Sequence, residues 1–213
     1  MITLKGSLGL LNESQRLYGI TNPIVAITGG IASGKSTFGK LLMGKGLNLI
    51  NADQLVHEIY LEEKTISYVQ RLAPQMVEDN KIDFKKLRTV FFENSLLKNA
   101  LENYLYQELP RYFISKLPKK KSVPILYDIP LLFEKNLEHQ VDLSVVVSCS
   151  QDLQIQRVKN RDQGDPDTTK KIISNQMSME DKVKKGNYHI ENDGDLEALK
   201  EEASKFFDLY FMT

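Results

Sequence analysis

Short apolar runs alternate with longer amphipathic stretches along most of the chain. Most of the runs are rich in β-branched residues, which is typical of buried parallel strands. Between them, apolar residues recur every three or four positions, a spacing that favours helices. This alternation predicts an α/β fold with a mainly parallel, five-stranded sheet and helices on both faces. The expected strands are 24–28, 47–51, 123–127, 141–148 and 188–190.

Residues 61–120 interrupt this alternation, because they contain no strand-like run. The segment predicts a helical insertion within the α/β fold. Two prolines, Pro74 and Pro110, are placed to kink or split the first and the last of its helices. The polar run 78–81 predicts a turn. The expected helices cover 66–77, 84–92 and 95–117.

Capping residues mark where several helices begin. Asp83 and Asn94 precede two helices of the insertion and are predicted N-caps. After a predicted helix at 152–161, Gly164 breaks the pattern, and Asp165 with Pro166 predicts the start of another helix through Gln176. We expect the segment 153–183 to form a lid, and a last amphipathic helix to cover 195–209.

The first strand runs into a glycine-rich loop with the spacing G-x-x-x-x-G-K-[ST], set here by Gly29, Gly34, Lys35 and Ser36. Backbone N–H groups of such a loop, and the start of the helix after it, attract a phosphate group. The lysine charge lies near the outer phosphates, and the serine hydroxyl is placed to ligate Mg²⁺. We favour this interpretation over a ligand-free turn, because strand and helix flank the loop as required. The predicted nucleotide-binding residues are Gly29, Gly30, Ile31, Ala32, Ser33, Gly34, Lys35, Ser36 and Thr37.

Further polar residues follow other predicted strands, at the edge of the sheet where ligands of such folds bind. Asp53 follows the second strand and is placed to accept a hydroxyl proton or to orient that hydroxyl; a helix N-cap is the alternative. Asp128 follows the third strand and is placed to hold the Mg²⁺ shell, or else is a turn residue. Asn192 and Gly194 lie in the loop after the fifth strand.

Two arginines lie on one face of the helix at 152–161, because Arg157 and Arg161 are four residues apart. We expect both to neutralise phosphate charge when the lid closes, with Arg157 in a catalytic role beside Lys35 and Asp53. A solvated basic helix surface is the alternative interpretation.

Composition limits the partners, cross-links and cellular locations that the chain can have. The chain has 213 residues with 28 basic and 28 acidic side chains, so no net charge favours nucleic acid as a partner. The single cysteine, Cys149, excludes an internal disulfide and predicts a small core residue. No apolar run is long enough to span a membrane, and no secretory signal is evident. We therefore expect a cytoplasmic protein, either a monomer or a weak homo-oligomer.

Residues 1–22 form an extension before the first strand. The pattern leaves open whether this extension is disordered, packs on the body or reflects the choice of start codon.

Several motifs together resemble the dephospho-CoA kinases. The resemblance runs from about Ile24 to the C-terminus and leaves out residues 1–22. The stretch Asp-Ile-Pro-Leu-Leu-Phe-Glu at 128–134 is the most discriminating. The other similar segments are 27–37, 50–53, 156–162, Gln176 with Glu180 and Lys182, and 190–194.

The resemblance implies an activity: ATP phosphorylates the ribose 3′-hydroxyl of dephospho-CoA, with Mg²⁺ as cofactor. It implies Asp53 as the base or orienting group, 61–120 as the acceptor-binding subdomain, and 23–213 as a P-loop kinase domain. Two positions depart from the family pattern. Asn51 stands where the family usually has Asp, and Tyr106-Gln107 replace a usual His-Pro in the long helix.

Three other functions remain as alternatives. One is another small-molecule or nucleotide kinase on the same fold. The second is a GTPase-type switch, because residues 80–83 spell its Asn-Lys-x-Asp motif, although they lie between two predicted helices. The third is a degenerate binding protein, which the presence of Lys35, Ser36 and Asp53 disfavours.

Overall fold

The computed structural model describes residues 2–6, 10–120, 123–162 and 166–213. The chain forms two compact units. The first unit combines Met1–Asn51 with Pro118–Thr213, and the second is Ala52–Leu117.

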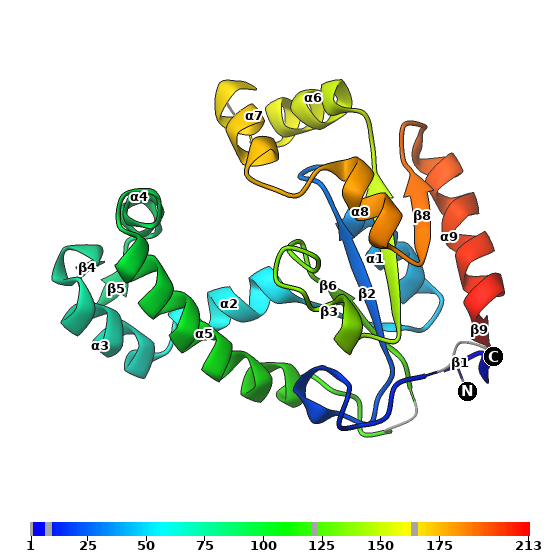
Figure 1. Cartoon of the computed structure of the whole chain (residues 1–213), viewed down its shortest axis with the longest axis horizontal. Helices are drawn as coiled ribbons and strands as arrows, with labels where there is room; N and C mark the ends of the chain where they lie inside the picture. The colour runs from blue at the N-terminus through cyan, green and yellow to red at the C-terminus, as the bar shows by residue number, and fades with distance from the viewer. Residues whose placement is uncertain (1, 7–9, 121–122, 163–165) are drawn as a thin grey trace. The chain divides into compact units, whose positions relative to one another are not determined.

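The first unit is built on a five-stranded sheet in which every neighbouring pair is parallel. The strand order is β3-β6-β2-β7-β8, so β2, which leads into the glycine-rich loop, lies at the centre (Figure 1). This confirms the predicted parallel sheet. Its strands are β2 (Ile24–Gly29), β3 (Asn48–Asn51), β6 (Ile125–Asp128), β7 (Leu143–Ser148) and β8 (Tyr188–Glu191).

Helices α1 and α9 pack together and share one apolar core with the sheet. Phe38 of α1 meets Phe206 of α9 edge to face, with ring centroids 5.6 Å apart. Strands β2, β6, β7 and β8 contribute Val, Ile and Leu side chains to the same core, as expected for strands covered on both faces. The helices of this unit are α1 (Lys35–Gly44), α6 (Gln151–Asp162), α7 (Pro166–Ser174), α8 (Met179–Lys185) and α9 (Leu196–Tyr210), with short 3₁₀ turns at Leu17–Gly19 and Glu138–Gln140.

The predicted elements of this unit agree with the structure to within a few residues, but some of its short elements were not predicted. Helix α7 begins at Pro166, as its sequence predicts, whereas the predicted N-cap, Asp165, lies outside the described residues. Asp195 caps α9 by accepting the amide of Ala198 at 2.9 Å. The short helix α8 was not predicted. Ser178 starts it by accepting the amide of Asp181 at 3.1 Å.

The N-terminal extension packs on the first unit wherever it is described. Strand β1 (Thr3–Leu4) pairs with β9 (Phe211–Met212) in an antiparallel ribbon. Arg16 forms a buried, two-point ion pair with Asp142, from Nε to Oδ2 at 2.7 Å and from Nη2 to Oδ1 at 2.8 Å. Among the possibilities that the sequence left open, the structure therefore selects packing on the body.

The second unit is mainly helical, as predicted, but it also contains a small hairpin. Strands β4 and β5 pair around the turn expected at 78–81, so the expectation of helices alone was wrong in detail. A helix ends at Leu72 and Pro74 opens a 3₁₀ turn, whereas Pro110 lies inside a continuous helix. Its elements are α2 (Ala52–Tyr60), α3 (Glu63–Leu72), a 3₁₀ turn (Pro74–Met76), β4 (Val77–Glu78), β5 (Lys81–Ile82), α4 (Phe84–Glu93) and α5 (Ser95–Ser115).

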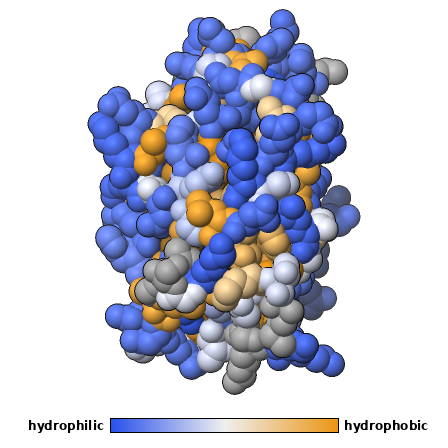
Figure 2. Space-filling view, turned by 90° about the vertical axis from the view of Figure 1, so that its right-hand side faces the viewer, coloured by the Kyte–Doolittle hydropathy of each residue, from blue (hydrophilic) through white to orange (hydrophobic). Residues whose placement is uncertain are grey.

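Hydrophilic residues cover most of the surface seen in Figure 2, the side on which α9 lies, with smaller hydrophobic areas between them. Of the helices in the described part of the chain, none combines the length and the apolar character that a membrane crossing requires.

Candidate nucleotide-binding site

The glycine-rich loop leaves the end of the central strand in a conformation that two glycines make possible. Gly29 has φ +146°, and a Cβ there would lie 2.0 Å from the carbonyl oxygen of Val147. Gly34 has φ +101°, and its Cβ would lie 2.1 Å from Nδ2 of Asn192. Neither position accepts a side chain without displacing its neighbour. Glycine at both positions therefore lets the loop pack closely against β7 and Asn192.

Lys35 begins helix α1 and its side chain folds back over the loop. Its Nζ donates to the carbonyl oxygens of Gly30 at 2.8 Å and Gly29 at 3.3 Å. Ser36 and Thr37 follow in the first turn and are exposed. The loop, the helix N-terminus and the ammonium group therefore converge, as an anion site requires.

A buried hydroxyl in the loop supports this assignment. Ser33 is fully buried, and its Oγ has no hydrogen-bond partner among the described residues. Buried polar groups in folded proteins almost always have a partner, and a ligand oxygen is a common one. The loop therefore fits a bound phosphate group by its backbone shape, its charge and its unsatisfied donor.

Two predicted residues from outside the loop contact it directly. Asn192 follows β8 and donates from Nδ2 to the carbonyl oxygen of Ser33 at 2.8 Å. Arg157 of α6 donates to the carbonyl oxygens of Asn192 at 2.9 Å and Ala32 at 3.5 Å. The side chain of Arg161 lies outside the described part of the chain. Gly194 lies two residues beyond Asn192, before the start of α9.

Asp128 lies at the carboxyl end of β6, next to the strand that leads into the loop. It pairs in register with Ile27 and is only 2% exposed. Asn51, at the end of β3, donates from Nδ2 to Oδ2 of Asp128 at 3.0 Å. The residue that departs from the family pattern therefore supports the carboxylate with a hydrogen bond, where an aspartate would oppose it with a second negative charge.

The donors near the loop fit a magnesium ion that arrives with a nucleotide. The Ser36 hydroxyl and the Asp128 carboxylate supply oxygen atoms, which Mg²⁺ prefers. Within the described residues, no three His, Cys, Asp or Glu side chains form a group that would hold a metal by themselves. Mg²⁺ in kinases uses one or two protein oxygens and takes the rest from phosphates and water, so a two-donor set is sufficient.

Asp53 belongs to the second unit and stands two residues after the end of β3. Helix α2 begins at Ala52, so Asp53 lies in its first turn and is not the residue before it. The carboxylate in that turn faces the positive end of the helix dipole. The start of α2 at Ala52 therefore does not indicate an N-cap role for Asp53.

Sequence reasoning missed two side chains that lie against the loop. A Cβ at Gly30 would lie 2.4 Å from Nε2 of Gln154 and 3.0 Å from Cε of Met179. Gln154 precedes Arg157 by three positions, so the helical spacing that selected Arg157 also places Gln154 on the same face. Met179 carried no such signal, because helix α8 was not predicted.

Two other features that the sequence raised as possible functional groups, Cys149 and the Asn-Lys-x-Asp run, have structural roles. Cys149 is 7% exposed, and burial raises the pKa of its thiol, so it is the small core residue that the sequence predicted. The Asn-Lys-x-Asp run at 80–83 lies at the hairpin of the second unit. Its Asp83 accepts the amides of Lys85 at 2.9 Å and Lys86 at 3.1 Å, which makes it the N-cap of α4.

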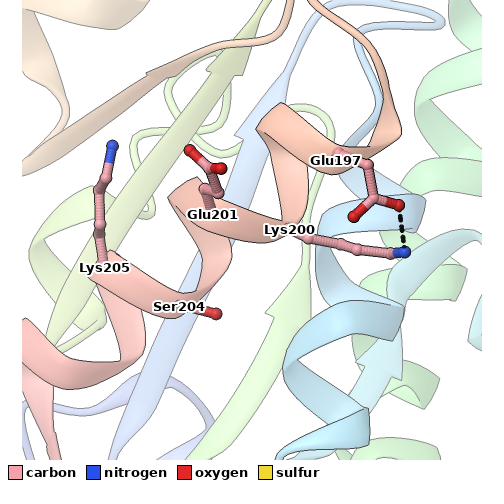
Figure 3. Close-up of a pocket in the computed structure, with 5 residues that line it drawn as sticks. All are labelled: Glu197, Lys200, Glu201, Ser204 and Lys205. Carbon is pink, nitrogen blue, oxygen red and sulfur yellow. Dashed lines mark hydrogen bonds and ion pairs between the residues drawn. The ribbon is translucent and has the colours of Figure 1, made fainter.

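An open hollow along α9 does not compete with the loop as a ligand site. All its lining side chains come from that one helix (Figure 3). Lys200 is paired with Glu197 at 2.6 Å, and Lys205 with Glu202 at 2.7 Å. Its cations are therefore already matched by carboxylates of the same helix. The lining residues are Glu197, Lys200, Glu201, Ser204 and Lys205.

Comparison with known proteins agrees with this geometry. The sequence model of the family described as dephospho-CoA kinase matches residues 23–198. The chain is 33% identical to the dephospho-CoA kinase of Fusobacterium nucleatum, over 86% of this chain and 96% of that protein. It is 32% identical to the dephospho-CoA kinase of Sulfurimonas denitrificans, over 86% and 92%. The solved structure of TT1252 from Thermus thermophilus is similar with a TM-score of 0.81 at 28% identity, covering 88% of this chain and 97% of that one.

Proposed function

The chain belongs to the dephospho-CoA kinase family, and we propose that it transfers the γ-phosphate of ATP to the ribose 3′-hydroxyl of dephospho-CoA, giving CoA and ADP. The observation that carries the proposal is the loop 29–37, with Lys35 and helix α1 directed at one anion-binding position. The loop follows β2, the central strand of the sheet, and the family model matches residues 23–198 of the chain.

The loop residues bind and neutralise the phosphates. Phosphoryl transfer requires positioned phosphates and compensated charge more than it requires covalent chemistry from the protein. The backbone N–H groups at 30–37 supply fixed donors, and Lys35 supplies a mobile positive charge. Ammonium contacts with the Gly29 and Gly30 carbonyls give way to contacts with the outer phosphates when ATP binds.

Ser36 and Asp128 are the residues that would hold Mg²⁺, Ser36 through its hydroxyl and Asp128 through its carboxylate. When bound, the ion offsets charge on the phosphate oxygens. Asn51 keeps the Asp128 side chain in place by its hydrogen bond to Oδ2 at 3.0 Å. Arg157 adds a positive charge beside the loop carbonyl of Ala32.

Asp53 acts on the acceptor. Chain order supports this role, because Asp53 stands two residues after the end of β3. It accepts the proton of the ribose hydroxyl or orients that hydroxyl. The helices within 61–120 bind the rest of dephospho-CoA, and the segment 153–183 forms the lid. We place the reaction in the cytoplasm, the compartment that supplies ATP, and expect a monomer or a weak homo-oligomer with no nucleic-acid or membrane partner.

The test is ADP release with Mg-ATP and dephospho-CoA, run beside adenosine, AMP and pantetheine phosphate as alternative acceptors. We expect turnover with dephospho-CoA alone. Turnover with another of these acceptors would assign the chain to a different small-molecule kinase activity. Turnover with none of them would overturn the proposed reaction. A parallel series with GTP in place of ATP tests the GTPase-type alternative.

A further inference from the structure

Helix α8 carries a lysine that the proposed reaction does not use. Lys182 is one of the largest fully buried side chains in the described part of the chain. A charged ammonium group enters a protein interior at a high energetic cost unless partners compensate it. The groups that contact the Lys182 ammonium therefore indicate its role in the structure.

The Lys182 ammonium joins two segments of the first unit. It donates to the carbonyl oxygen of Pro130 at 3.1 Å and lies 2.9 Å from Oε1 of Glu134. Both partners lie in the loop after β6. Because the side chain is fully buried and both contacts are directed at this loop, Lys182 holds protein groups and does not reach a nucleotide.

The same two acceptors bind other segments of the unit. The Pro130 carbonyl also accepts the hydroxyl of Thr28 at 3.2 Å, and Thr28 directly precedes the glycine-rich loop. Glu134 Oε1 also accepts the amide of Met177 at 2.9 Å, just before α8 begins. The Lys182–Glu134 pair therefore connects the end of β2 to the first turn of α8.

Helix α8 in turn contacts the glycine-rich loop. The Cε atom of Met179, in the first turn of α8, lies 3.0 Å from the position that a Cβ of Gly30 would take. A displacement of this turn would therefore move a methyl group that lies directly on the loop. The charge pair and the methyl contact act on the same short segment, residues 28–30.

The pair is not arranged for stability alone. Oε2 of Glu134 is buried and has no hydrogen-bond partner among the described residues. Buried ion pairs seldom stabilise a fold more than apolar side chains of similar size, and their best-attested use is to specify one arrangement over others.

We propose that Lys182 and Glu134 are positioning residues of the phosphotransfer site. Their buried ion pair holds α8 against the loop after β6 and thereby sets the position of the glycine-rich loop at Thr28–Gly30. The expected change in kcat rests on the proposed kinase activity. The expected change in the position of the glycine-rich loop does not depend on which acceptor the protein uses.

The test compares Lys182→Met and Glu134→Gln with Lys184→Met as the matched control. Lys184 lies on the same helix but is exposed, and it pairs with Glu180 at 2.8 Å. The measurements are kcat, the KM for ATP, the melting temperature, and hydrogen exchange of the amides at 29–37 with ADP bound. All kinetic measurements are made well below the melting temperature, with the folded fraction checked by circular dichroism.

For Lys182→Met we expect kcat to fall about 10- to 100-fold while the KM for ATP changes less than about threefold, because a small displacement of bound phosphates costs rate more than affinity. Exchange at 29–37 becomes faster. Glu134→Gln shows the same changes to a smaller degree, because its amide oxygen still accepts hydrogen bonds. Lys184→Met stays within about twofold of the parent protein in every measurement.

A merely structural pair would lower the melting temperature but leave kcat per folded protein and loop exchange unchanged, and that result overturns the inference. If Lys182→Met does not fold, Glu134→Gln decides by the same criteria. If the parent protein shows no turnover with dephospho-CoA, the proposed function fails, whereas loop exchange in the variants still decides the positioning role.

Discussion

At the residue scale, the chemistry of the site depends on how each side chain is held before ATP arrives. Asn51 and Asp128 lie at neighbouring strand ends, and the amide of Asn51 donates to Oδ2 of Asp128 at 3.0 Å. Compared with the aspartate that the family usually has at position 51, Asn51 lacks a negative charge but supplies an amide group that donates a hydrogen bond to Asp128. The hydrogen bond favours one orientation of the Asp128 carboxylate, which supports the metal-holding role proposed for it.

The first residue-scale prediction concerns Lys35. In Lys35→Ala we expect kcat to fall by at least about 100-fold, because the transition state loses the charge that compensates the outer phosphates. ADP release with Mg-ATP and dephospho-CoA measures the effect. Lys40→Ala, on the exposed side of the same helix, is the control and should be unchanged. A rate near that of the parent protein in Lys35→Ala would contradict the phosphate-loop assignment.

The second residue-scale prediction concerns Asp53. Asp53→Asn keeps the shape of the side chain but removes its ability to accept a proton, so we expect kcat to fall about 100-fold or more. The KM for ATP and the dissociation constant of ADP should stay within about threefold of their parent values. Gln54→Ala, at the next position of the same helix, serves as control. An equal loss of rate and nucleotide affinity, or no loss, would count against the assigned role.

At the element scale, one buried carboxylate binds several groups of the N-terminal extension. Asp142 accepts the amides of Leu11 at 2.9 Å and Ile24 at 2.7 Å, in addition to its two contacts with Arg16. The guanidinium also donates to the carbonyl oxygen of Ile20 at 3.0 Å. The extension and the start of the central strand are therefore held by the same buried group.

The element-scale prediction follows from that burial. Arg16→Met leaves the Asp142 carboxylate buried without its cation, so we expect the free energy of unfolding to fall by about 3 kcal/mol. Urea unfolding measures it. Lys205→Met removes an exposed pair with Glu202 and should change stability by less than about 0.5 kcal/mol. Equal urea midpoints for Arg16→Met and the parent protein would show that the Arg16–Asp142 pair contributes nothing to stability.

At the scale of the whole molecule, the residues proposed for nucleotide chemistry lie mainly in one unit and those proposed for acceptor binding in the other. The glycine-rich loop, Arg157, Asn192 and Asp128 belong to the first unit. Asp53 and the helices proposed to bind the acceptor belong to the second, Ala52–Leu117. Two ligands should therefore leave separate signatures on the backbone.

The whole-molecule prediction is that hydrogen exchange, followed by mass spectrometry, resolves these signatures. ADP should slow exchange in the segment 29–37, because the loop amides donate to its phosphates. Dephospho-CoA should slow exchange within Ala52–Leu117, because binding reduces local opening there. Protection by dephospho-CoA confined to the first unit would show that the second unit is not the acceptor subdomain.

Much of this arrangement was accessible from local sequence. The strands of the parallel sheet, the glycine-rich loop and the caps at Asp83 and Asn94 were predicted, because each depends on residues close together in the chain. Apolar runs of β-branched residues specify strands, and capping side chains bond to amides two or three positions away. The spacing Gly29–Ser36 indicated the phosphate site for the same reason, since the loop makes its own binding surface.

Tertiary structure decided the features that depend on distant partners. The pairing of Thr3 with Met212, the ion pair of Arg16 with Asp142, and the burial of Lys182 against Glu134 have no local signature. A lysine in a short polar helix is expected to be exposed, because lysine is seldom buried without a partner. The local sequence does not show which carboxylate will be that partner. The sequence by itself determined most of the helices, the strands of the parallel sheet and the glycine-rich loop between β2 and α1. Only the packing of the chain determined which charged groups were buried together, because the interaction energy of a buried ion pair arises here from groups far apart in sequence.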